Sequence, residues 1–81
     1  MSEIIIHRKI GCGFSEKAIQ LLNTLNLYYS IIDYNPNDPN YNLRKENLFN
    51  ITHFNTFPQI IINGRLIGGY SDLVKFYSVK Q

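Results

Sequence analysis

Apolar residues along this chain fall into short runs and into segments with helical spacing. Residues 4–7 begin with three consecutive isoleucines, which predicts a buried strand. Residues 14–26 carry apolar side chains on one helix face, at Ala18, Leu21, Leu22 and Leu25. Residues 28–33 are rich in Tyr and Ile and predict a second strand. A strand, a helix and a strand of these lengths form a βαβ unit, in which the two strands are parallel.

The second half of the chain predicts a further helix, a hairpin and a last helix. A Pro- and Asn-rich turn at residues 35–39 precedes a helix over 41–50, whose apolar residues are Leu43, Leu48 and Phe49, with Ile51 just beyond. Residues 59–62 form a third strand, and Asn63-Gly64 is a strong signal for a two-residue turn into a fourth strand at 65–67. Ser71 is expected to be the N-cap of a last helix, with Asp72 at its positive end. The packing face of this helix consists of Leu73, Val74, Phe76 and Tyr77.

The predicted order is therefore β-α-β-α-β-β-α in a single α/β domain over residues 1–81. A parallel half joined to a hairpin half gives a four-stranded mixed sheet flanked by helices on both faces. This architecture is the minimal thioredoxin fold.

Composition limits the classes of function. The chain has 81 residues and a formal net charge of +2, which is too weak a basic bias to indicate a nucleic-acid partner. Its apolar runs are too short to span a membrane, and residues 1–3 lead into a strand without a signal peptide. A single cysteine cannot form an internal disulfide. We therefore expect a reducing, cytoplasmic location.

The single cysteine, Cys12, lies between two glycines where the first strand gives way to the first helix. At a helix N-terminus, unpaired N–H groups and the helix dipole favour the thiolate over the thiol. Lys9, three residues earlier, adds positive charge. The alternative is a buried structural cysteine, since free cysteines are often buried. The flanking glycines and the polar Ser15 favour the reactive interpretation.

Five short segments in order along the chain resemble the glutaredoxin family. Cys12-Gly13-Phe14-Ser15 is similar to the monothiol active-site motif of that family, and Thr56-Phe57-Pro58-Gln59 is similar to its Thr-Val-Pro or Thr-Phe-Pro segment. The hairpin Asn63-Gly64 is followed by Gly68-Gly69 and Ser71-Asp72-Leu73, as in the family. The resemblance covers essentially the whole chain. It implies a thioredoxin fold, an oxidoreductase activity and a glutathione site.

The resemblance assigns a role to each part of that site. Cys12 would be the attacking thiolate, beside Phe14, and Lys9 and Lys45 would attract the glycine carboxylate of glutathione. Thr56, Phe57 and Pro58 would present backbone groups to its cysteine portion, with Pro58 at the position that is cis in the family. The γ-glutamyl end would meet Gly69, Tyr70, Ser71 and Asp72. The alternatives without a binding role are that Lys9 and Lys45 are solvated surface charges and that Ser71 and Asp72 only cap a helix. His7 and His53 are not expected to be metal ligands.

Two features depart from the iron–sulfur class of monothiol glutaredoxins. The loop over residues 8–11 is short and Lys9 is close to Cys12, as in the dithiol redox class. Where a Trp-Pro is usual before the Thr-Phe-Pro segment, this chain has Phe54-Asn55, and Tyr70 stands where many redox-class members have Cys or an acidic residue. The chain therefore combines the motif of one class with the frame of the other.

Three functions follow from these patterns. The first is a glutathione-dependent oxidoreductase that acts on glutathionylated proteins through Cys12 as a monomer. The second is a homodimer in which two copies of Cys12 and two glutathiones hold a [2Fe–2S] cluster. The third is a thioredoxin-fold interaction module whose cysteine is idle. The short loop favours the first function, and the motif around Cys12 favours the second.

Overall fold

The computed structural model describes residues 2–78 and has the predicted order of elements. The elements are β1 (Ile4–Lys9), α1 (Gly13–Thr24), β2 (Ser30–Tyr34), α2 (Tyr41–Thr52), β3 (Gln59–Ile62), β4 (Arg65–Gly68) and α3 (Tyr70–Ser78). The strands form one sheet in the order β2-β1-β3-β4. β2 runs parallel to β1, whereas β3 is antiparallel to both β1 and β4. This mixed sheet confirms the thioredoxin fold.

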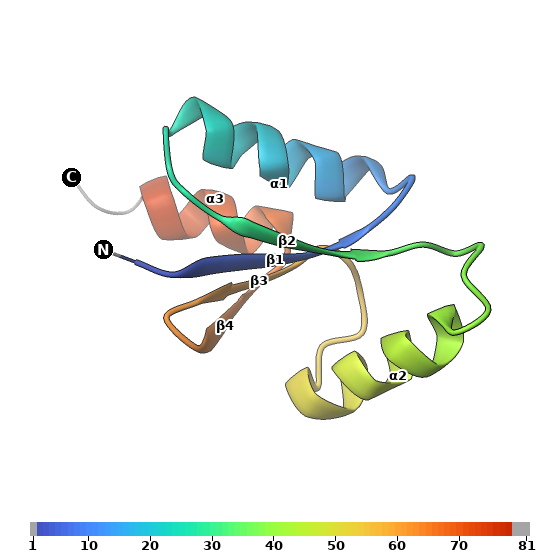
Figure 1. Ribbon diagram of the computed structural model, residues 1–81. Coiled ribbons are helices and arrows are strands. Elements are labelled where there is room, and N and C mark those ends of the chain that lie inside the picture. The colour runs from blue at the N-terminus through green and yellow to red at the C-terminus, as the bar shows by residue number, and fades with distance from the viewer. Residues whose placement is uncertain (1, 79–81) are drawn as a thin grey trace.

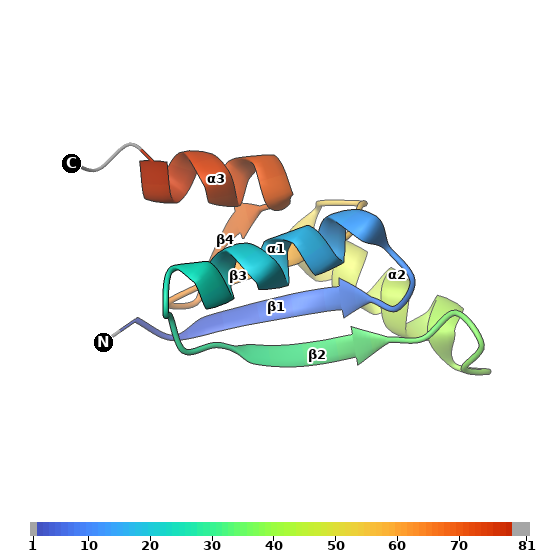
Figure 2. The same cartoon turned by 90° about the horizontal axis from the view of Figure 1, so that it is seen from above.

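The main core lies between the sheet and the pair α1 and α3. These two helices lie side by side on one face of the sheet, and α2 lies on the other face (Figures 1 and 2). Successive strand side chains point to opposite faces, so every second residue of β1 points toward α1. The fully or nearly buried residues of this core are Ile4, Ile6, Ala18, Leu22, Ile60, Ile62 and Leu73.

The α2 face of the sheet is covered less completely. Leu48 is the buried apolar residue of α2, and it is 6% exposed. Leu43 and Ile51, which the sequence pattern included among the apolar residues of this helix, are 60% and 78% exposed. The prediction of a helix here is confirmed, but these two side chains are not part of its packing face.

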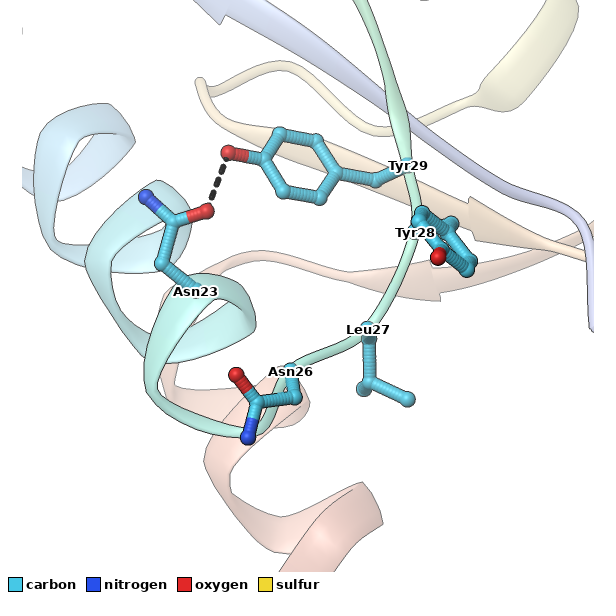
Figure 3. Close-up of a pocket in the computed structure, with 5 residues that line it drawn as sticks. All are labelled: Asn23, Asn26, Leu27, Tyr28 and Tyr29. Atoms are coloured by element: carbon cyan, nitrogen blue, oxygen red, sulfur yellow. Dashed lines mark hydrogen bonds between the residues drawn. The ribbon is translucent and has the colours of Figure 1, made fainter.

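The junction between α1 and β2 differs from the predicted bounds. Asn26 adopts a left-handed φ of 56°, and the Leu27 N–H donates to the Leu22 carbonyl over 3.1 Å. Together with the Asn26 N–H bond to Asn23 O (3.0 Å), this is a Schellman motif, which ends the helix at Thr24 rather than at residue 26. The chain then passes a hollow lined by Asn23, Asn26, Leu27, Tyr28 and Tyr29, where the Tyr29 hydroxyl donates to Asn23 Oδ1 over 2.6 Å (Figure 3).

The hairpin between β3 and β4 forms as predicted. Asn63 and Gly64 both have positive φ, at 52° and 79°, as a type I′ turn requires. The Asn63 side chain also accepts a hydrogen bond from the Glu3 N–H over 2.8 Å. The turn therefore fixes the register of β3 against β1, which brings the residues before β3 close to the loop after β1.

A candidate active site at the N-terminus of helix α1

Cys12 is the N-cap residue of α1, just beyond the end of β1. Its backbone is extended, at φ −96° and ψ 119°, and its carbonyl accepts the Glu16 N–H over 3.2 Å. The preceding residue, Gly11, has φ +86°, a left-handed conformation that glycine adopts without strain. The sharp turn after Lys9 therefore delivers a half-buried thiol to the open end of the helix.

The surroundings of Cys12 favour the thiolate. Partial burial of the thiol raises its pKa, but hydrogen bonds from the Ser15 N–H, the Ser15 hydroxyl and the Phe14 N–H lower it, and so does the charge of Lys9. The net effect is a pKa below the ordinary value of a cysteine thiol. The neutral Sγ makes no capping hydrogen bond of standard geometry, so these donors act chiefly on the charged form.

The loop that enters β3 forms the opposite wall of the site. The Phe57-Pro58 peptide bond is cis, as the resemblance implied, and the Phe57 carbonyl lies 3.9 Å from Cys12 Sγ. The Phe57 ring packs between the rings of Tyr34 and Phe49, at centroid distances of 5.1 and 5.7 Å. The backbone of Phe57 is thus held close to the sulfur.

A groove of about 470 Å³ runs beside this wall to the N-terminus of α3. Phe14 and Tyr70 contact each other at its side, with ring centroids 6.2 Å apart. It is lined by Phe14, Phe54, Thr56, Phe57, Pro58, Gly69, Tyr70, Ser71 and Asp72. Eight of these nine residues are among those that the sequence assigned to a glutathione site. The fold therefore brings together segments that lie more than forty residues apart in the sequence.

The start of α3 differs from the sequence prediction. The helix begins at Tyr70, and the Gly69 carbonyl accepts the Leu73 N–H over 3.0 Å, so Gly69 is the N-cap and Ser71 lies within the first turn. The expectation that Ser71 is the N-cap is wrong. Asp72 Oδ2 instead accepts the Gly69 N–H over 3.0 Å, as an acidic residue at the third helical position does in a capping box. Ser71 is consequently exposed at the groove.

The sequence matches the glutaredoxin family over residues 4–67, which is most of the chain and includes Cys12 and the cis-proline segment. The chain belongs to the glutaredoxin family.

Individual relatives agree with this assignment, and a solved structure shares the fold. The chain is 36% identical over 66 residues to bifunctional monothiol glutaredoxin-S16 of Arabidopsis thaliana, covering 82% of this chain but only 22% of that protein. It is 39% identical over 71 residues to glutaredoxin 1 of Rickettsia bellii, covering 86% of this chain and 71% of that one. The crystal structure of the buckwheat glutaredoxin–glutathione complex shares its fold with a TM-score of 0.83 at 21% identity, covering 94% of this chain and 68% of that one.

Two lysines assigned to the site do not line the groove of this glutaredoxin. Lys9 is partly buried at the end of β1, where its charge reaches Cys12. Lys45 projects from α2 with its Nζ 5.1 Å from the centre of the Tyr41 ring. If either contacts a ligand, it does so from outside the groove.

Sequence reasoning missed two residues near the site. Phe54 lines the groove, and an aromatic residue two positions before Thr56 was a signal that could have indicated this. Arg44 packs its guanidinium 4.2 Å from the centre of the Tyr34 ring and donates to the Asp33 carbonyl over 2.7 Å. Its contacts depend on how α2 lies against β2, which sequence spacing does not reveal.

Residues 2–78 contain no group of three or more His, Cys, Asp or Glu side chains placed to hold a metal ion. The hollow of Figure 3 lies at the other end of α1 from Cys12 and contains no thiol or carboxylate. The chemistry of the described part of the chain is therefore concentrated around Cys12.

Proposed function

We propose that this glutaredoxin is a glutathione-dependent thiol–disulfide oxidoreductase that acts by a monothiol mechanism through Cys12. The main support for this proposal is the position of the Cys12 sulfur. Cys12 Sγ has a lowered pKa at the N-terminus of α1, and it lies 3.9 Å from the Phe57 carbonyl at the wall of an open groove. A thiolate that is both stabilised and accessible is what thiol–disulfide exchange requires.

In the first step, the Cys12 thiolate attacks the glutathione sulfur of a glutathionylated protein. The S–S bond of that protein breaks, and a bond forms between Cys12 and glutathione. The protein leaves as a thiolate, which then takes a proton from water. No net oxidation occurs in this step, because one disulfide replaces another.

In the second step, the thiolate of a free glutathione attacks the glutathione sulfur attached to Cys12. Oxidised glutathione forms and the Cys12 thiolate leaves. The pair of electrons that reduces the substrate therefore comes from the free glutathione, and the other half of the oxidised glutathione is the glutathione removed from the substrate. Because Cys12 is the single cysteine, no intramolecular disulfide competes with this route.

The groove would orient glutathione so that its sulfur faces Cys12. The backbone of Phe57 would bind the cysteine portion in the manner of an added strand. The exposed Ser71 and the N-terminus of α3 suit the γ-glutamyl carboxylate, and the Asp72 oxygen that does not bind Gly69 N–H suits the γ-glutamyl ammonium.

The other residues assigned to the site would act from its edges. Phe14 and Tyr70 would flank the bound tripeptide, with Thr56, Pro58 and Gly69 completing the wall. Lys9 and Lys45 would attract the glycine carboxylate. The buckwheat relative with the same fold was solved with glutathione, which supports a glutathione site in this chain.

A [2Fe–2S] carrier is the second candidate, and the surroundings of Gly13 favour it. A Cβ added at this exposed glycine would meet nothing within 4 Å, so there is open space next to Cys12. One chain offers a single thiolate, whereas a cluster needs four ligands, so two chains and two glutathiones would be required. The residues present therefore fit a cluster only in a homodimer.

The location and the other partners remain predictions. We propose a cytoplasmic protein that acts on glutathionylated proteins as a monomer, or as a homodimer if a cluster bridges two chains, without a nucleic-acid or membrane partner. None of the helices described between residues 2 and 78 is long and apolar enough to cross a membrane.

The test is reduction of a glutathionylated peptide by glutathione, coupled to glutathione reductase and followed as loss of NADPH. Rapid, saturable NADPH loss is expected with the unaltered chain, and none above the background is expected with Cys12→Ser. Circular dichroism of the variant establishes that the fold is retained. Equal rates for the two proteins would exclude the proposed role of Cys12.

A flat trace from a folded protein would shift the assignment to the second candidate. Anaerobic reconstitution with iron, sulfide and glutathione would then be required to give a visible absorption band and a dimer on gel filtration. The Cys12→Ser variant should give neither.

A further inference from the structure

Tyr34 contacts both the loop that leads to Cys12 and Phe57, which lies in the loop before β3. It is the last residue of β2, it is 5% exposed, and its Cα pairs in register with Lys9 at the end of β1. The Tyr34 carbonyl accepts the Ile10 N–H over 2.9 Å, within the loop that leads to Cys12. Through its ring, the same residue contacts Phe57 on the opposite wall, with centroids 5.1 Å apart.

The Tyr34 side chain is fixed by groups from two further elements. Its hydroxyl hydrogen-bonds to His7 Nδ1 in β1 over 2.9 Å. The Arg44 guanidinium of α2 stacks 4.2 Å from the centre of its ring and is itself held by a 2.7 Å bond to the Asp33 carbonyl. A ring held at its edge and covered on its face has little freedom to move.

The Phe57 ring depends on this support. Its other aromatic neighbour is Phe49 of α2, 5.7 Å away, so the ring packs between two others. The backbone carbonyl of the same residue lies 3.9 Å from Cys12 Sγ. If the Phe57 ring changes its position, the Phe57 backbone that faces Cys12 Sγ therefore moves with it.

We propose that Tyr34 is a positioning residue for the mixed disulfide between Cys12 and glutathione. It holds the Phe57 backbone where that backbone can bind the peptide part of glutathione. This inference rests on the proposed function, since it assumes that glutathione is the partner of Cys12. Tyr34 contacts the groove-lining residue Phe57 but does not itself line the groove, so its effect is on the placement of the ligand and not on the exchange chemistry.

A positioning role for Tyr34 affects the stability of the mixed disulfide with glutathione but not the reactivity of the Cys12 thiolate, whereas a general loss of structure would change both. The groups that stabilise the Cys12 thiolate are Ser15, Phe14 and Lys9, and Tyr34 is not among them. Loss of the Tyr34 ring should therefore weaken the mixed disulfide with glutathione, which needs the Phe57 backbone. It should leave intact the mixed disulfide with 2-mercaptoethanol, which has no peptide backbone to bind.

The experiment compares the two equilibria in the full chain. Protein is equilibrated with reduced and oxidised glutathione, or with 2-mercaptoethanol and its disulfide, and the modified fraction is measured by intact mass. For Tyr34→Leu we expect the glutathione exchange constant to fall about tenfold and the 2-mercaptoethanol constant to stay within about twofold, because only the former depends on ligand placement. Tyr34→Phe keeps the ring and should stay within about threefold of the unaltered chain for both ligands.

Tyr29→Leu is the matched control. It replaces a tyrosine with leucine just before the first residue of β2, whereas Tyr34 is the last residue of that strand. The Tyr29 hydroxyl bonds to Asn23 (Figure 3), which lies near the C-terminus of α1, whereas Cys12 is at the N-terminus of that helix, so both constants should keep their original values. If Tyr34→Leu does not fold by circular dichroism, Tyr34→Met, which has a similar volume without a ring, carries the same test.

Two outcomes would overturn the proposal. One is a folded Tyr34→Leu or Tyr34→Met variant with the original glutathione constant, and the other is an equal fall in both constants. Failure of the proposed function is distinguishable from both, since the unaltered chain would then give no Cys12-dependent loss of NADPH with the glutathionylated peptide.

Discussion

The hydroxyl of Ser15 accepts a hydrogen bond from the Lys9 N–H over 3.3 Å, and both residues act on the same sulfur. Ser15 is fully buried, three residues after Cys12. Its oxygen accepts from the last residue of β1 while its proton is free to point at Sγ, where it lowers the pKa of Cys12. Ser15, the last residue of the Cys12-Gly13-Phe14-Ser15 motif, is thus one of the groups that activate Cys12.

Ser15→Ala should make Cys12 less reactive. The variant loses a hydrogen bond to the charged sulfur, so the pKa of Cys12 rises toward its ordinary value. The rate of alkylation by iodoacetamide below neutral pH should fall roughly tenfold, the size expected for one such bond. At high pH, where both proteins are fully thiolate, the rates should converge. Parallel rate profiles at every pH would show that Ser15 does not act on the thiolate.

Protonation of His7 should lower the free energy of unfolding at acidic pH. Burial lowers the pKa of His7 below 6.5, and the charge of Arg44 lowers it further. The unfolded chain therefore binds the proton more readily, so the free energy of unfolding should decrease as the pH falls through 6.5 and level off below the folded-state pKa.

His7→Asn tests this pH dependence, because its amide can replace Nδ1 as the partner of the Tyr34 hydroxyl but does not titrate. At neutral pH the variant should lose about 1 kcal/mol from reduced packing. Urea unfolding across the acidic range should show a flatter slope than in the unaltered chain. An unchanged slope would mean that other groups cause the acid sensitivity.

The order of elements could be predicted because its signals are local. The isoleucine runs of β1 and β3, the helical spacing in α1 and the Asn63-Gly64 turn each depend on a few consecutive residues. The apolar faces of α2 and α3 were predicted too wide, since Leu43, Ile51, Val74 and Phe76 are exposed. The other errors fell at helix ends, where backbone hydrogen bonds decide which residue is the cap. Ser71 is a good cap by residue type, but Gly69 and Asp72 make the capping hydrogen bonds instead.

The site could be predicted where it follows family motifs in short segments, as at Cys12 and Pro58. The contacts of Tyr34 with His7 and Phe57 could not, because they join residues from β1, β2 and the loop before β3. They follow from the register that pairs Lys9 with Tyr34 and His7 with Gln59, and a sequence pattern does not specify such a register.

Gly68 should not tolerate a side chain. Its φ is +129°, and a Cβ there would lie 2.9 Å from Asp72 Cβ and closer still to the Asp72 carboxylate. Gly68→Ala should cost about 2 kcal/mol or more, since it adds a strained backbone to a steric clash. It should also displace the Asp72–Gly69 bond and weaken glutathione binding.

Gly13→Ala is the matched control for Gly68, because a Cβ there meets nothing within 4 Å and the φ of Gly13 is not positive. In the first turn of α1, alanine should be neutral or stabilising by up to about 1 kcal/mol. The comparison is made by urea unfolding. Equal losses in the two variants would contradict the role given to Asp72.

In helix α2, we expect the buried Leu48 to stabilise the fold and the exposed Leu43 to contribute little. Leu48 packs on the sheet at 6% exposure, whereas Leu43, on the same helix, is 60% exposed. Leu48→Ala should lower the free energy of unfolding by about 2–4 kcal/mol, and Leu43→Ala by less than about 0.5 kcal/mol. Both substitutions leave helix propensity nearly unchanged, so their difference in urea midpoint isolates burial. A loss at Leu43 as large as at Leu48 would mean that the exposed side of α2 is covered in solution.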